Sequence, residues 1–116
     1  MLRILICDDR DDTRDMLAEL LALKGHLVEI VVDGAGAIRR VATGDLDVAL
    51  IDIGLPDMSG YDVALAIRAQ ATPVRLIALT GYATDADHLA ATDAGFDAWF
   101  SKPVKIEVLL AALRPL

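Results

Sequence analysis

The chain has 116 residues, a mass of 12.4 kDa and a formal net charge of −7, from 11 basic and 18 acidic residues. This length predicts a single domain over residues 1–116, and an apolar share of 55% is enough for a core without disulfides. The negative charge disfavours direct nucleic-acid binding, and the apolar runs are too short for a membrane helix. Cys7 is the single cysteine, and the N-terminal segment is too short for a secretory signal, so we expect a cytoplasmic protein without a disulfide framework.

Short apolar runs alternate with segments of helical periodicity over the whole chain. The pattern predicts five strands, over 4–7, 27–32, 48–51, 76–79 and 98–100. A helix is predicted after each strand. In chain order, the first helix ends near Gly25, the second runs from Asp33 to Gly44, the third starts near Ser59, the fourth runs from Thr84 or Asp85 to Gly95, and the fifth runs from Ile106 to Leu113. We expect Asp11 or Asp12 to cap the first of these helices.

This alternation predicts an α/β domain with a doubly wound, five-stranded parallel sheet and helices on both faces, a three-layer sandwich. The first, third and fourth strands are almost wholly apolar, which suits strands that are covered on both faces. The second strand carries Glu29 and the fifth is very short, as the edges of a sheet tolerate. We therefore predict the strand order 2-1-3-4-5 of the flavodoxin-like (βα)5 fold, whose ligands bind beyond the carboxyl ends of the strands.

Polar residues follow four of the predicted strands where each strand ends. They are Asp8 and Asp9 after the first, Asp52 after the third, Thr80 after the fourth and Lys102 after the fifth. In the predicted order these strand ends are neighbours, so three carboxylates, a hydroxyl and an ammonium should meet in one cleft. Each residue alone has an ordinary explanation, as a helix cap, a turn residue or a surface lysine, and their joint placement is what predicts a site.

Three carboxylates in one cleft repel each other unless a proton or a cation relieves the repulsion. Carboxylate oxygens suit Mg²⁺, which keeps several waters and takes one or two carboxylates. An aspartate can accept a phosphoryl group covalently, while a lysine and a hydroxyl contact the remaining phosphoryl oxygens. The cluster therefore predicts Mg²⁺-dependent phosphoryl transfer to an aspartate.

On these residues, the chain resembles the receiver domain of two-component response regulators. The matching segments occur in the family's order and are residues 4–9 (ILICDD), 50–60 (LIDIGLPDMSG), 78–81 (ALTG) and 101–103 (SKP). Together they form a specific pattern that spreads over the whole chain. The resemblance implies a phosphorylation-dependent signalling switch that catalyses only its own phosphoryl transfer and autodephosphorylation, and not an enzyme in the usual sense.

The resemblance also implies a role for each site residue. Asp52 would accept the phosphoryl group. Asp9, Asp52 and the backbone carbonyl of Gly54 would hold Mg²⁺, and Asp8 would act on the same ion through water. Lys102 would pair with the phosphoryl group or, before phosphorylation, with Asp52.

A conformational switch follows from the same resemblance. Thr80 would turn toward the phosphoryl group, and Trp99 would change rotamer with it, at a position where Tyr, Phe or His is more usual. The Lys102–Pro103 peptide bond is expected to be cis, an isomer found in about 5–6% of X–Pro bonds in general. The moving face would run from the fourth strand to the fifth helix, carry His88 and meet an output partner.

The implied phosphodonor is a histidine kinase or a histidine phosphotransfer protein, and the sequence does not define the output protein or domain. We expect neither a membrane nor a nucleic-acid partner, and a monomer or weak dimer. The stretches 79–82 and 95–98 resemble receivers attached to hybrid histidine kinases. A free-standing receiver and a segment of a larger protein therefore both stay open.

Three alternatives use similar residues. A haloacid-type phosphatase also has a nucleophilic Asp at a strand end, but it needs a second acid two residues later, where Gly54 stands. A flavin-binding protein shares the strand order, but Asp8, Asp9 and their acidic neighbours would repel the flavin phosphate. A receiver that binds partners without being phosphorylated would keep the same fold, and the intact set of site residues argues against it.

Overall fold

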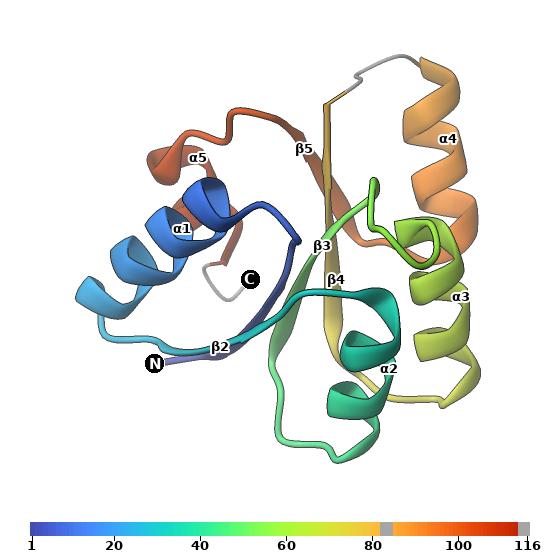
Figure 1. The fold of residues 1–116 in the computed structure, drawn as a ribbon, viewed down its shortest axis with the longest axis horizontal. Coiled ribbons are helices and arrows are strands. Elements are labelled where there is room, and N and C mark those ends of the chain that lie inside the picture. Colours follow the sequence, from blue (N-terminus) through green and yellow to red (C-terminus); the bar gives the residue numbers. More distant parts are fainter. Residues whose placement is uncertain (82–84, 114–116) are drawn as a thin grey trace.

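The computed structural model of the chain describes residues 1–81 and 85–113, and strands alternate with helices as the sequence predicts (Figure 1). The strands are β1 (Arg3–Cys7), β2 (Leu27–Val31), β3 (Val48–Asp52), β4 (Arg75–Thr80) and β5 (Ala98–Ser101). The helices are α1 (Asp11–Leu23), α2 (Gly34–Ala42), α3 (Gly60–Ala69), α4 (Asp85–Ala94) and α5 (Ile106–Leu113). Within the described ranges, no helix has the length and apolar character that crossing a bilayer requires.

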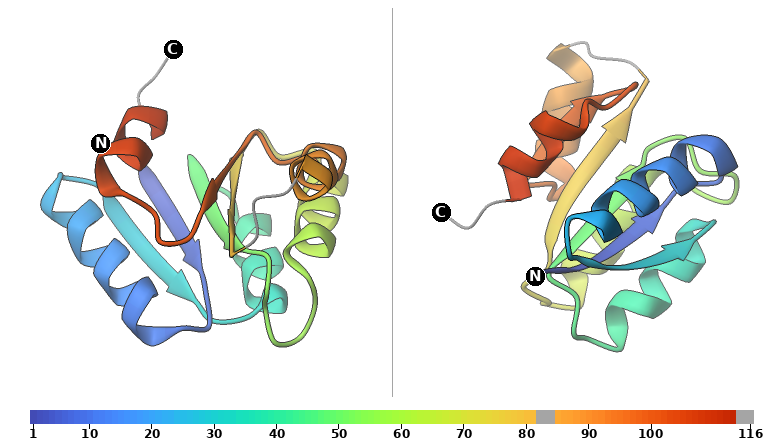
Figure 2. Two further views of the ribbon diagram at one scale, coloured as in Figure 1. Left: turned by 90° about the horizontal axis from the view of Figure 1, so that it is seen from above. Right: turned by 90° about the vertical axis from the view of Figure 1, so that its left-hand side faces the viewer.

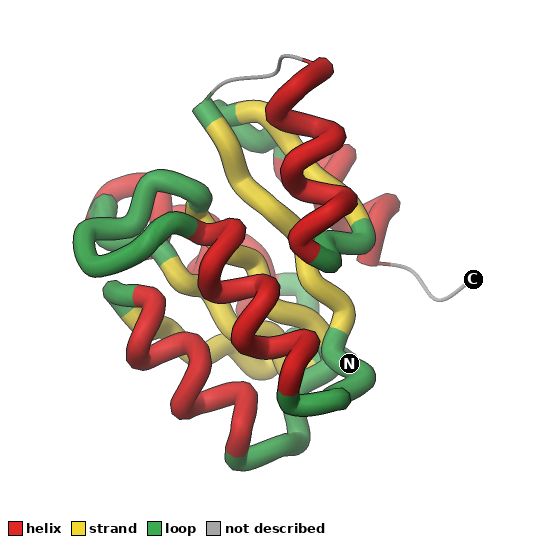
Figure 3. Tube along the Cα trace, turned by 90° about the vertical axis from the view of Figure 1, so that its right-hand side faces the viewer, coloured by secondary structure: helices red, strands yellow, loops and turns green. Residues whose placement is uncertain are grey.

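All five strands are parallel and form one sheet in the order β2-β1-β3-β4-β5, which confirms the predicted topology. Helices α1 and α5 cover one face of the sheet, and α2, α3 and α4 cover the other, as Figure 1 and the view from above in Figure 2 show. The latter three helices lie side by side across their face (Figure 3). The chain starts inside the sheet and winds toward both edges, so its crossover helices fall on opposite faces.

The sheet separates two hydrophobic cores, because successive side chains of a strand point to opposite faces. Ile4 and Ile6 of β1 belong to the core under α1 and α5. Leu5 and Cys7 belong to the core under α2, α3 and α4. All four side chains are completely buried, which explains why the central strands are unbroken apolar runs in the sequence.

The start of helix α1 differs from the prediction. Arg10 occupies its N-cap without a side-chain cap hydrogen bond, and Asp11 and Asp12 lie in the first helical turn instead of at the cap. The reason is that the Asp8 carboxylate accepts a hydrogen bond from the Arg10 N–H at 3.0 Å, so Asp8 makes the turn that leads into the helix. Of the two caps predicted for the fourth helix, Thr84 lies outside the described residues, and Asp85 is the first residue of α4 itself.

The loop that follows β3 is attached to the N-termini of two helices. The Asp57 carboxylate accepts hydrogen bonds from the backbone N–H groups of Gly34 (2.8 Å) and Ala35 (3.0 Å) at the start of α2. These bonds lower the pKa of Asp57, because they favour its charged form. Ser59 caps α3, and its hydroxyl accepts from the Asp62 N–H at 3.2 Å. Both attachments fix the course of the loop directly after the strand.

Helix α3 begins so close to β3 that its first residue has no room for a side chain. A Cβ at Gly60 would lie 2.7 Å from the backbone oxygen of Asp52 and 2.7 Å from Cα of Ile53. The Gly60 N–H also donates to the Ile53 carbonyl at 2.9 Å. Because both close contacts are to backbone atoms, they cannot be relieved by a rotamer change.

We therefore expect Gly60→Ala to lower the free energy of unfolding by about 1–3 kcal/mol, since the added methyl overpacks against the end of β3. Urea denaturation of the purified variant measures this loss. Gly81→Ala is the matched control, because a Cβ there meets no atom within 4 Å. An equal loss in both variants would contradict the explanation by close packing.

Candidate functional site

The carboxyl ends of four neighbouring strands lie together at one edge of the sheet. The last paired residues are Cys7 with Ile51, Asp52 with Leu79, and Thr80 with Ser101. Because these parallel strands end at the same edge of the sheet, the residues that directly follow them lie close to one another. This arrangement brings the residues that were singled out in the sequence into one region.

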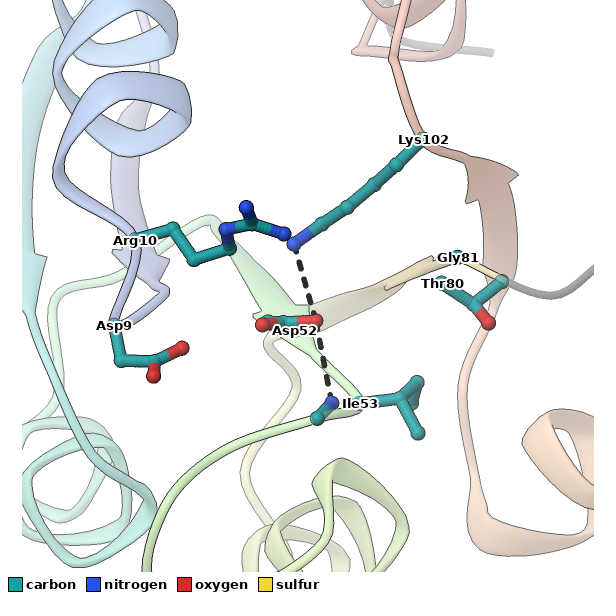
Figure 4. Close-up of a pocket in the computed structure, with 8 residues that line it drawn as sticks. Asp9, Arg10, Asp52, Ile53, Thr80, Gly81 and Lys102 are labelled. Atoms are coloured by element: carbon teal, nitrogen blue, oxygen red, sulfur yellow. Dashed lines mark hydrogen bonds and ion pairs between the residues drawn. The ribbon is translucent and has the colours of Figure 1, made fainter.

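A cavity of about 560 Å³ opens at this edge of the sheet (Figure 4). It is lined by residues from the strand ends, namely Asp9, Arg10, Asp52, Ile53, Gly54, Thr80, Gly81 and Lys102. The lining includes four of the five residues predicted to meet here. The fifth, Asp8, is completely buried and reaches the site through its contact with Lys102.

Lys102 links the two buried carboxylates. Its Nζ lies 3.2 Å from Asp8 Oδ2 and 3.2 Å from Asp52 Oδ1. Only 17% of the lysine side chain is exposed, so solvent screens these ion pairs less than it screens surface pairs. The Lys102 N–H donates to the Thr80 carbonyl at 2.8 Å, which ties the loop after β5 to the end of β4. The Lys102–Pro103 peptide bond is cis, as predicted from the sequence.

Backbone N–H groups complete the surroundings of both buried carboxylates. Asp8 Oδ1 accepts from the Arg10 N–H, the same bond that starts α1. Asp52 Oδ1 accepts from the Gly54 N–H at 3.2 Å. The side chain of Asp9 is exposed, and Figure 4 shows it on the opposite side of Asp52 from Thr80. The three acids are therefore in distinct environments, two enclosed and one open to solvent.

Burial raises the pKa of Asp52 above its ordinary value, because the charged carboxylate is poorly solvated in the folded protein. The Lys102 ammonium and the Gly54 N–H act in the opposite direction, and the negative charge of Asp8 adds to the increase. The ionised form of Asp52 is thus costly in the folded state. A bound cation would reduce that cost.

The carboxylates of Asp8, Asp9 and Asp52 form a group that could hold a metal ion. One ligand oxygen from each residue lies within 4.8 Å of the other two. A set of hard oxygen donors suits a divalent cation such as Mg²⁺ better than it suits a soft metal. The donor chemistry therefore fits the ion predicted from the sequence, and the part of the Gly54 carbonyl in holding it stays a prediction.

Trp99, on β5, is not among the described residues that line the cavity, and its side chain packs instead against α4. Its ring stacks on His88 of α4, with the ring centroids 4.6 Å apart and an interplanar angle of 29°. The small residue Ala78 is its partner on β4, and Thr80 lies two residues further along the same face. The sequence predicts His88 on this face but not its contact with Trp99, because the stack depends on how α4 packs.

The residues predicted to form the site do not include Arg10, although it lines the cavity. Its position directly after the acid pair is the one signal that could have pointed to it. Cys7 is an inert core residue, since burial raises the pKa of its thiol to about 12. Tyr82, in a stretch that resembles hybrid-kinase receivers, lies outside the described residues.

A parallel (βα)5 sheet with acids and a lysine at its carboxyl edge is the arrangement that the resemblance to receiver domains implies. The model of the response regulator receiver domain family matches residues 4–114, and the chain belongs to this family. Transcriptional regulatory protein TcrA of Mycobacterium tuberculosis is 36% identical over 116 residues, which cover 98% of this chain and 45% of TcrA. The chain spans about half the length of the curated relatives it matches.

Solved structures agree with this assignment. A CheY-like receiver domain protein from Methanospirillum hungatei has a TM-score of 0.90 at 31% identity, over 97% of this chain and 90% of that one. A response regulator from Burkholderia pseudomallei, solved with a phosphorylated aspartic acid, a calcium ion and citrate, has a TM-score of 0.89 at 26% identity. That match covers 98% of this chain and 67% of the other. The doubly wound receiver fold is thus confirmed.

The raised pKa of Asp52 predicts a pH-dependent loss of stability. The folded state binds a proton on Asp52 more tightly than the unfolded state does, so protonation of Asp52 stabilises the fold. This stabilisation is fully present below the unfolded pKa of about 4. It is lost as the pH rises through the folded pKa. Asp52→Asn avoids this loss and should raise the free energy of unfolding by about 1 kcal/mol at pH 7 without Mg²⁺.

Urea unfolding of both proteins at pH 7 and near pH 4 measures the difference. The gain from Asp52→Asn should shrink as the pH falls, because wild-type Asp52 is then protonated. Asp62→Asn, which removes an exposed carboxylate, is the control and should give no such gain. A gain that does not depend on pH would contradict the role of the Asp52 charge.

Proposed function

We propose that the chain is a phosphorylation-dependent switch in which Asp52 accepts a phosphoryl group from a phosphohistidine. The observation that carries this proposal is the contact of Lys102 with both Asp8 and Asp52 inside a group of three carboxylates. An ammonium that already neutralises the acceptor can pair with a phosphoryl oxygen once the acceptor is modified. The pairing of Lys102 with Asp52 that the resemblance to receiver domains implies before phosphorylation supports the proposal.

Asp52 is the best placed of the three acids to act as the nucleophile. It lines the cavity, whereas Asp8 is completely buried. Lys102 and the Gly54 N–H both contact Oδ1 and so orient the carboxylate. In the transfer, an Asp52 oxygen bonds to phosphorus as the bond from phosphorus to the donor imidazole nitrogen breaks, and the imidazole leaves with the electron pair. Lys102 then pairs with a phosphoryl oxygen.

The proposed metal is Mg²⁺, held by Asp9, Asp52 and the Gly54 carbonyl, with Asp8 acting through water. When bound, the ion supplies positive charge that shields carboxylate and phosphoryl oxygens from each other. The grouping of three carboxylates supports this assignment. The chain's own part is to hold the acids at fixed positions, through the hydrogen bonds to Asp8 and Asp52.

The proposed donor is a histidine kinase or a histidine phosphotransfer protein, and the proposed location is the cytoplasm. The solved relative with a phosphorylated aspartic acid supports an acceptor of this kind. The output is a protein or domain that meets the face running from β4 to α5. We propose no direct contact with nucleic acid, in line with the net charge of −7.

Incubation with acetyl phosphate and Mg²⁺ should add one phosphoryl group to the wild-type protein, measured as intact mass. Asp52→Asn should gain none, because the acceptor oxygen is lost. Chelation with EDTA before the donor is added should abolish the gain in wild type. Asp62→Asn is the matched control, since it removes an exposed carboxylate on α3 and should be modified like wild type.

Two results would contradict this function. A mass gain in Asp52→Asn equal to that of wild type would exclude Asp52 as the acceptor. No gain in wild type, from acetyl phosphate or from a phosphohistidine donor protein, would favour a module that binds its partners without phosphorylation.

The proposed switch runs from Thr80 to Trp99 and on to α4. Thr80 lines the cavity beside Asp52, and Trp99 lies on the same face of the sheet one strand away. Because Trp99 stacks on His88, a change in the indole position would also move or release α4. Small Ala78 beside Trp99 supports this proposal, since it leaves the indole room on the strand.

Trp99 is the single tryptophan of the chain, so its emission reports this site alone. We expect phosphorylation to change the emission in wild type, because the stack with His88 is altered. Thr80→Ala should still be phosphorylated on Asp52 but lose most of this change. Thr43→Ala, at the far end of α2, should behave like wild type. An unchanged response in phosphorylated Thr80→Ala would exclude the proposed coupling.

A further inference from the structure

Arg10 directs a guanidinium into the cavity that contains Asp52. It lines this cavity with Asp52 and Lys102, and Figure 4 shows the Arg10 and Lys102 side chains extended toward each other on the same side of Asp52. The backbone sets its position, because Arg10 occupies the N-cap of α1 and its N–H is bonded to the buried Asp8. A second cationic side chain thus lines the cavity that contains the candidate phosphoacceptor.

The guanidinium of Arg10 makes no ion pair or hydrogen bond with any residue in the described part of the chain. Other arginines do, at Arg14 with Asp11 (2.9 Å), Arg40 with Glu29 (2.6 Å) and Arg68 with Asp97 (2.8 Å). A guanidinium carries five N–H donors in a planar fork that matches two oxygens of a phosphoryl group. Arg10 is therefore available for an anion that enters the cavity.

The charges of the site favour such a role. Three carboxylates face two cations, so an incoming phosphoryl group meets net repulsion unless a divalent cation is bound. Lys102 is already shared between Asp8 and Asp52 and is a point charge with limited exposure. Arg10 is exposed and pairs with no carboxylate of the described residues, so it can contact a phosphodonor before that donor reaches Asp52.

We propose that Arg10 is a second phosphoryl-binding residue, which contacts the phosphodonor before transfer and the phosphoryl group on Asp52 after it. The inference rests on the proposed function of Asp52. With acetyl phosphate, an Asp52 oxygen bonds to phosphorus as the bond to the acetate oxygen breaks, and acetate leaves with the electron pair. Arg10 keeps its protons throughout and acts by hydrogen bonding and charge.

The test uses Arg10→Gln, Arg10→Lys and the control Arg39→Gln, which removes the same charge from the exposed end of α2. Two readouts are measured, the acetyl phosphate concentration that half-saturates Asp52 phosphorylation, and the equilibrium affinity for the phosphoryl mimic beryllofluoride with Mg²⁺. Arg10→Gln should weaken both by about fivefold to tenfold, as expected for charge-assisted hydrogen bonds in a partly solvated site. Arg10→Lys should lie between, and Arg39→Gln should match wild type.

The affinity for Mg²⁺ alone, followed by Trp99 emission or calorimetry, separates this role from a general disturbance. Loss of a positive charge beside the acids should leave Mg²⁺ binding unchanged or tighter, the opposite sign to the effect on anions. If Arg10→Gln weakens Mg²⁺ binding as well, Arg10 only supports the acidic loop and the proposal is wrong. If both anion readouts match those of Arg39→Gln, the proposal is also wrong.

Failure of the proposed function gives a different result. In that case wild type itself gains no phosphoryl mass and binds no beryllofluoride, and the role of Arg10 is excluded together with that of Asp52. When wild type is phosphorylated, the comparison of Arg10→Gln with Arg39→Gln alone decides the role of Arg10.

Discussion

The compensation of buried negative charge at the carboxyl edge of the sheet is the constraint on which the site depends. Asp8 and Asp52 are almost fully enclosed, and a carboxylate without partners in such a place would be costly. Lys102 supplies the positive charge for both, and backbone N–H groups supply the remaining hydrogen bonds. The compensation is incomplete, because burial still raises the pKa of Asp52. A site that retains excess negative charge is ready to take a cation.

The rest of the fold holds these charges at fixed distances. Register between parallel strands brings the strand ends to one level. The loop after Asp52 is attached to α2 through Asp57, and Gly60 brings α3 against the backbone of Asp52 itself. On the other side of the site, the contact to α4 is a ring stack between Trp99 and His88. Thus backbone contacts hold both the loop after Asp52 and the end of β4, whereas the Trp99–His88 contact with α4 is made by side chains alone.

Much of this arrangement could be predicted from the sequence. Apolar runs that end in Asp8 and Asp52 define both strands and site, because strand period and strand end are local signals. The position of Arg10 after the acid pair is a sequence signal, but the direction of its side chain could not be predicted, since it depends on the turn made by Asp8. The contact of Trp99 with His88 depends on the distance between β5 and α4, which no local pattern encodes. The prediction that Asp11 or Asp12 caps α1 is wrong for a related reason, because Asp8 makes the turn that leads into the helix and places Arg10 at the N-cap.

The ion pair between Lys102 and Asp8 joins residues 94 positions apart in the sequence. Contacts between residues so far apart in the sequence form late in folding, because the entropy cost of closing the intervening chain has to be overcome first. While a nascent chain emerges from its N-terminus, all three acids are made long before the ammonium that balances them. The chain up to the end of β4 therefore contains the three acids but not Lys102, the residue that pairs with Asp8 and Asp52. The balance of charge at this site is therefore completed only when the segment after β5 has been made.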